Sequence, residues 1–64
     1  MKTENLEKAL QSFDLLKQDI RAAHTDAVYS ENRFAETSVF SILEMITAIE
    51  PKIRRAGVDA GIIK

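Results

Sequence analysis

Hydrophobic side chains recur along the first half of the chain at the spacing of a helical heptad. With Leu6 taken as position a, that position holds Leu6, Phe13, Ile20 and Ala27, and position d holds Ala9, Leu16 and Ala23. Leu10, at position e, widens the stripe into the face of a helix that packs in a bundle. Thr3 is a candidate N-cap, with Glu4 near the positive end of the helix dipole. The pattern predicts a helix from about residue 4 to about residue 29.

A second stripe follows a polar break. Residues 30–33 read Ser-Glu-Asn-Arg, and Ser30 and Asn32 are both good N-caps. The second stripe is Ala35, Val39, Ile42, Ile46, Ile49 and Ile53, at intervals of 4, 3, 4, 3 and 4, with Phe40, Leu43 and Met45 beside it. Val and Ile favour strands, but apolar pairs that repeat every three residues indicate a helix. One continuous helix through the break is the alternative; it would be a long rod with two unrelated stripes.

Pro51 leaves two possibilities for the end of the second helix. A helix of about 33–50 either ends there, with Pro51 opening a short last turn, or kinks at Pro51 and continues to about residue 56. Gly57 is a candidate C-cap in both cases, which leaves residues 57–64 as a short tail. Ile62 and Ile63 in that tail could cover the open end of the core.

The amount of apolar surface predicts self-association. The second helix is apolar over more of its circumference than one partner helix can cover, and Leu15, Ala22 and Tyr29 form a further row on the first helix. A chain of 64 residues has little core of its own, and without Cys it has no disulfide to add stability. We expect an all-α fold in one domain (1–64), an αα-hairpin that forms a homodimeric four-helix bundle. Its core and dimer interface would use Val39, Phe40, Ile42, Leu43, Ile46 and Ile49.

Charge is divided unevenly along the chain. Residues 1–50 hold five basic and nine acidic side chains, net −4, whereas residues 51–64 hold four basic and one acidic, net +3. Lys52, Arg54 and Arg55 form the basic cluster. They would either complement the helix dipole near a C-terminus or contact an anion such as nucleic-acid phosphate.

The sequence offers little catalytic or metal-binding chemistry. His24 is the single histidine, the residue type most often used as a general acid or base near neutral pH, and its helix neighbours Ile20 and Val28 can serve neither as acid–base partners nor as ligands. We therefore interpret His24 as a boundary histidine. The two glycines, Gly57 and Gly61, lie in no phosphate-binding motif, and the carboxylates share no metal-binding spacing. These observations predict a protein that is not an enzyme and that has no cofactor or metal.

No apolar run resembles a signal peptide or approaches the roughly 20 residues of a membrane span. We expect a soluble, cytoplasmic protein without a membrane partner.

Two resemblances follow from this layout. The two-helix chain is similar in architecture to the Rop family of plasmid copy-control proteins, which form four-helix dimers and bind an RNA kissing complex. No motif is shared with that family, so no RNA-contact residue is carried over. The opening Met1-Lys2-Thr3-Glu4-Asn5-Leu6, the heptad hairpin and the short basic tail also resemble the small all-helical accessory proteins of lambdoid phages, encoded between the exonuclease and excisionase genes. That resemblance implies contact with host proteins during infection.

These observations predict a regulatory protein that acts by binding a host or other partner protein, with Leu15, Ala22 and Tyr29 as the partner surface. The alternative is a small dimeric RNA- or DNA-binding regulator that uses Lys52, Arg54 and Arg55.

Overall fold

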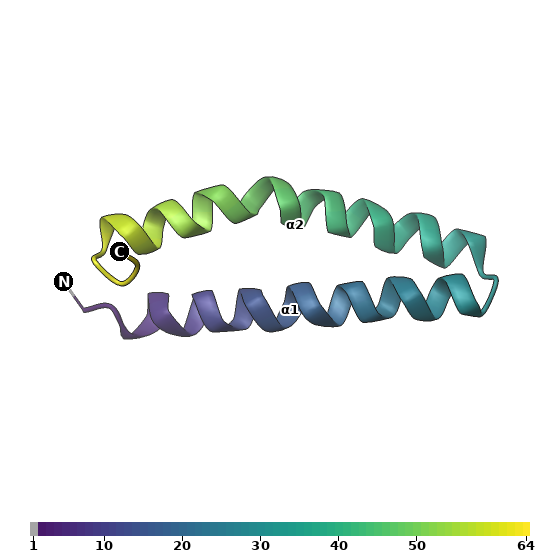
Figure 1. Cartoon of the computed structure of the whole chain (residues 1–64), viewed down its shortest axis with the longest axis horizontal. Helices are drawn as coiled ribbons and strands as arrows, with labels where there is room; N and C mark the ends of the chain where they lie inside the picture. The colour runs from purple at the N-terminus through teal and green to yellow at the C-terminus, as the bar shows by residue number, and fades with distance from the viewer. Residues whose placement is uncertain (1) are drawn as a thin grey trace.

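The computed structural model describes residues 2–64, and over that range it contains two α-helices and no strand. Helix α1 spans Glu4–Tyr29 and helix α2 spans Arg33–Asp59. The helices run antiparallel, side by side, and together measure 47 × 17 × 16 Å (Figure 1). The predicted αα-hairpin is therefore confirmed.

The polar break forms the turn between the helices. Asn32 caps α2, because its side-chain oxygen accepts a hydrogen bond from the Ala35 N–H at 3.1 Å. The Asn32 N–H donates to the Ala27 carbonyl, also at 3.1 Å, which closes the end of α1. Between them Glu31 adopts φ +55°, a left-handed conformation that glycine usually occupies at the end of a helix. The turn thus fixes the hairpin at the cost of one strained non-glycine residue.

Thr3 does not cap α1 through its side chain. It occupies the N-cap position, but its hydroxyl donates to the Glu7 carboxylate at 3.0 Å and no side-chain capping bond forms. The backbone carbonyl of Thr3 instead accepts the Glu7 N–H at 2.8 Å. Thr3 is therefore the N-cap residue of α1, as expected, but its side chain makes no capping hydrogen bond.

Helix α2 continues through Pro51 and ends at Asp59, three residues beyond the longer of the two expected ends. The helix is bowed, arching away from α1 along its middle (Figure 1). Pro51 has no N–H to donate to the Thr47 carbonyl, and its ring crowds the preceding turn, so a bend near this position is expected.

Gly57 is a buried helical residue and not a C-cap. The left-handed residue that ends α2 is Gly61, at φ +78°. The N–H groups of Ile62 and Ile63 both donate to the Gly57 carbonyl, at 2.9 and 3.2 Å, so the last residues fold back toward α1 (Figure 1). Both isoleucines are half-buried there, which confirms that they cover the open end of the hairpin.

The seam between the helices is narrow. In α1 it consists of Leu6, Leu10, Phe13, Lys17, Ile20, His24 and Ala27, and in α2 of Ala35, Val39, Leu43, Ile46, Glu50, Ile53 and Gly57. Ala27 and Ile46 are its buried hydrophobic side chains, 7% and 5% exposed; Gly57 is also buried, and the others are half-buried. On α1 the seam therefore consists of heptad positions a and e. Of position d, which the sequence pattern placed in the stripe, Ala9 and Leu16 are exposed and Ala23 is half-buried.

Candidate interaction surface

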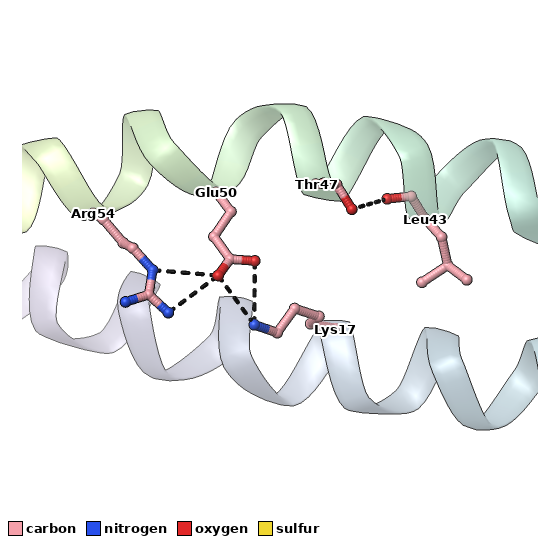
Figure 2. A network of polar contacts seen from close by, with 5 residues as sticks. All are labelled: Lys17, Leu43, Thr47, Glu50 and Arg54. Atoms are coloured by element: carbon pink, nitrogen blue, oxygen red, sulfur yellow. Dashed lines mark hydrogen bonds and ion pairs between the residues drawn. The ribbon is translucent and has the colours of Figure 1, made fainter.

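A polar network crosses the middle of the seam. The Lys17 ammonium of α1 lies 3.2 Å from one Glu50 carboxylate oxygen of α2 and 3.3 Å from the other (Figure 2). Arg54, one turn after Glu50, donates to the same carboxylate at 3.1 and 3.2 Å. These hydrogen bonds, that of Lys17 above all, lower the pKa of Glu50 below its ordinary value against the opposing effect of desolvation. A charged pair thus replaces an apolar contact at the centre of the hairpin.

One side of the hairpin carries a group of mostly exposed apolar side chains, interspersed with the polar residues Ser12, Asp19, Ser38 and Lys52. In an antiparallel pair, the residue just before each seam position turns to the same side on both helices. Leu16 and Ala23 precede the seam residues Lys17 and His24, while Ile42, Met45 and Ile49 precede Leu43, Ile46 and Glu50. The large members are 41–61% exposed. We call this surface the apolar face; it comprises Ala9, Leu16, Ala23, Ile42, Met45, Ile49 and Ala56.

The residues expected in the core and dimer interface fall into two groups, one in the seam and one on the apolar face. Val39, Leu43 and Ile46 contribute to the seam with α1. Ile42 and Ile49 point away from α1, onto the apolar face. The sequence pattern identified the apolar residues of α2 but did not separate these two sets.

Phe40 is not a core side chain of the hairpin: it is 52% exposed, on the side opposite the apolar face. The ring of the half-buried His24 lies against it, with 5.9 Å between ring centroids and a 47° tilt. Together with Glu36 and Thr37 these rings line an open hollow of about 320 Å³. His24 thus occupies a boundary position, as its place in the heptad indicated.

The row of Leu15, Ala22 and Tyr29 lies on the outer side of α1 and is exposed. Tyr29 is 84% exposed, at the turn end of the helix, and Leu15 lies near its middle. The residues fall seven apart, so they form one line of contacts along four turns of helix. A line of this kind can dock against another helix.

The basic residues near the end of α2 do not form one cluster in space. Arg54 pairs with Glu50, and Arg55 pairs with Asp59 at 3.1 Å, each within one turn of α2. Lys52, Arg54 and Arg55 project from different sides of the helix, as their spacing requires. Because α2 ends at Asp59, its last turn contains no basic residue. The helix-dipole interpretation of these cations was therefore wrong; local ion pairs account for both arginines.

Over residues 2–64, no group of three or more His, Cys, Asp or Glu side chains is placed to hold a metal ion. Neither helix within this range has a segment of the length and hydropathy needed to cross a membrane. Comparisons of the chain with protein-family models, with characterised proteins and with solved structures find no match.

Sequence reasoning missed Lys17 and Glu50 as seam residues. The available signal was positional: Lys17 lies seven residues after Leu10 and seven before His24, in the row that borders the position-a stripe. Because Lys17 is charged, the sequence favoured placing it on the solvent-exposed side of the helix. In the structure the carboxylate of Glu50 pairs with the Lys17 ammonium, which offsets the cost of partly burying it.

Proposed function

We propose that this chain is a non-enzymatic interaction protein, active as a homodimer, that binds a partner protein. The observation that supports the proposal is the exposure of apolar surface. Within residues 2–64, ten large hydrophobic side chains are at least two-fifths exposed, whereas two hydrophobic residues are buried. Four of these side chains, Leu16, Ile42, Met45 and Ile49, lie together on the apolar face, and an exposed apolar patch is typical of proteins that bind other proteins.

The total surface supports the homodimer. The hairpin exposes 5276 Å². A compact monomer of 7.2 kDa would expose about 4,100 Å², so roughly 1,100 Å² is in excess. One partner in a standard protein–protein interface contributes about 800 Å². The excess is large enough for a full interface.

The charges favour a protein partner over nucleic acid. Arg54 and Arg55 are exposed, but each is paired with a carboxylate of the same helix that offsets its charge, and residues 1–50 carry net −4, which repels phosphate. The net charge of +3 on residues 51–64 is the observation that favours the nucleic-acid alternative.

For the partner surface we propose the outer row of Leu15, Ala22 and Tyr29. It is exposed, it has helical spacing, and an exposed aromatic side chain is typical of binding hot spots. The resemblance to phage accessory proteins implies that the partner is a host protein.

Affinity capture from nuclease-treated lysate tests the partner surface. Leu15→Lys with Tyr29→Ala should abolish capture of a partner while helical circular dichroism and the dimer mass persist. Val58→Lys with Phe40→Ala makes matched changes at side chains of the α1–α2 hairpin that lie outside the row, and capture should survive them. If the row variant captures partner like the parent, or if captured material consists of nucleic acid when nuclease is omitted, the proposal is wrong. If the row variant dissociates the dimer, the row is part of the dimer interface and not the partner surface.

A further inference from the structure

We propose that the hollow beside Phe40 binds the arginine side chain of a polypeptide ligand. The hollow measures about 320 Å³, is open to solvent and lies on the side of the hairpin opposite the apolar face. Its volume is at the lower end of the range of ligand pockets, so it suits a single side chain. The site is separate from the outer row of Leu15, Ala22 and Tyr29, and it goes beyond the interaction function proposed above.

Three of the four residues that line the hollow come from one part of α2. Glu36 lies four residues before Phe40 and Thr37 lies three residues before it, so both side chains adjoin the Phe40 ring within about one turn of helix. Arginine carries a flat cationic group whose N–H donors match a carboxylate and whose face stacks on an aromatic ring. The Glu36 carboxylate, the Thr37 hydroxyl and the Phe40 ring therefore offer one guanidinium an anionic acceptor, a neutral acceptor and a π surface.

The Glu36 carboxylate is free to accept a ligand. Over residues 2–64, none of the ion pairs or side-chain hydrogen bonds of the hairpin includes Glu36, although Arg33 lies three residues before it. Glu36 is also half-buried. A cation that enters the hollow thus meets a partly desolvated carboxylate whose charge no neighbour offsets, and a charge-assisted hydrogen bond is stronger in such surroundings than in bulk water.

The Phe40 ring is supported on one side and open on another. The His24 ring of α1 packs against it, with 5.9 Å between ring centroids and a 47° tilt. Phe40 is nevertheless 52% exposed, so part of its surface remains accessible to a ligand. A ring that is already held in place loses little conformational freedom when a cation binds to it, which favours binding.

The distribution of charge along the hairpin favours a cationic ligand at this end. Residues 18–49 form the half that includes the turn and the hollow, and they carry five acidic and two basic side chains, net −3. The other residues, 1–17 and 50–64, carry five acidic and seven basic side chains, net +2. The negative half attracts a positively charged ligand and repels a carboxylate or a phosphate.

NMR titration of the isotope-labelled protein with a blocked Gly-Arg-Gly peptide tests the site. The backbone signals of Glu36, Thr37 and Phe40 should shift and saturate, with a dissociation constant in the millimolar range. A peptide with citrulline in place of arginine keeps the shape of the side chain but not its charge, and it should give no saturable shift. If the citrulline peptide binds equally well, or if the arginine peptide shifts only signals outside the hollow, the inference is wrong.

Substitutions in α2 show whether the peptide binds in the hollow. Glu36→Gln should weaken binding about fivefold, because it removes the carboxylate with little change of shape. Phe40→Leu should weaken binding about threefold, because it removes the aromatic face. Glu44→Gln is the matched control: it removes an exposed carboxylate about two turns further along α2 and should change binding by less than about twofold. Equal losses from Glu36→Gln and Glu44→Gln would show that the peptide responds to net charge alone, and would overturn the inference.

The same variants also show whether the hollow is free in the assembled protein. Glu36→Gln and Phe40→Leu should match the parent chain in helical circular dichroism and in sedimentation mass, because the hollow lies on the side opposite the apolar face. A variant that keeps its helicity but sediments at a lower mass than the parent would place the hollow in an interface between copies, and the arginine site would be refuted.

Discussion

Two effects of opposite sign act on an alanine substitution at Gly57: helix propensity would stabilise the protein, and crowding against neighbouring side chains would destabilise it. In a helix interior, Gly→Ala is worth about 1 kcal/mol of stabilisation. A Cβ at Gly57 would, however, lie 2.7 Å from Ile63 Cδ1, 3.1 Å from Ile63 Cγ1 and 3.3 Å from Leu10 Cδ1. Displacing the half-buried Ile63 side chain costs roughly 1 kcal/mol, about half the value of burying an isoleucine fully. We therefore expect Gly57→Ala to change the free energy of unfolding by less than about 0.5 kcal/mol.

The two effects separate in a double-mutant cycle with Ile63→Ala. Without the Ile63 side chain the nearest contacts disappear, and Gly57→Ala should then stabilise the fold by about 1 kcal/mol. Urea unfolding followed by circular dichroism, at equal chain concentration for all four proteins, gives the coupling. An equal gain of about 1 kcal/mol in both backgrounds would show that Ile63 does not pack on Gly57. Destabilisation in both backgrounds would show that Leu10 cannot shift, and the reasoning from Ile63 would fail.

Three further perturbations test the turn, the seam network and the basic residues. Glu31→Gly should stabilise the protein by about 0.5–1 kcal/mol in urea unfolding, because glycine adopts φ +55° without strain; an unchanged midpoint would contradict the strained turn. The native pKa of Glu50 is lowered, so its contribution to stability is complete above the unfolded pKa of about 4.3 and is lost as the pH falls through the native value. Stability of the parent relative to Glu50→Gln should therefore decrease below about pH 5, and parallel pH curves would refute this assignment. Arg54→Ala with Arg55→Ala should change stability by less than about 1 kcal/mol, because both pairs are exposed helix-surface contacts; a nucleic-acid function would require the double variant to bind more weakly with a shallower salt dependence.

The sequence predicts where the two helices lie along the chain, but not which side of each helix faces the other. Heptad spacing is visible in one chain, and the polar segment at 30–33 separates two stripes regardless of what they contact. Which rows meet depends on pairs of side chains from both helices. Lys17 enters the seam because Glu50 lies opposite it, and Leu16 turns outward as a result. A pattern read one helix at a time contains no information about that pairing.

The end of α2 illustrates a second limit. Pro51 and Gly57 are both statistical helix terminators, yet the helix continues through both. Gly57 is needed where Ile63 and Leu10 approach the backbone closely, and this approach exists only once the tail has folded back. The residue that ends α2 is Gly61, whose left-handed φ lets the backbone reverse.

Sedimentation equilibrium of the parent chain over a wide concentration range tests the central claim most directly. The account predicts twice the 7.2 kDa chain mass at high concentration, and on dilution a loss of mass accompanied by a loss of helical circular dichroism. A mass of 7.2 kDa with full helicity at every concentration would show that the hairpin is stable with its apolar face in water, and would contradict the account.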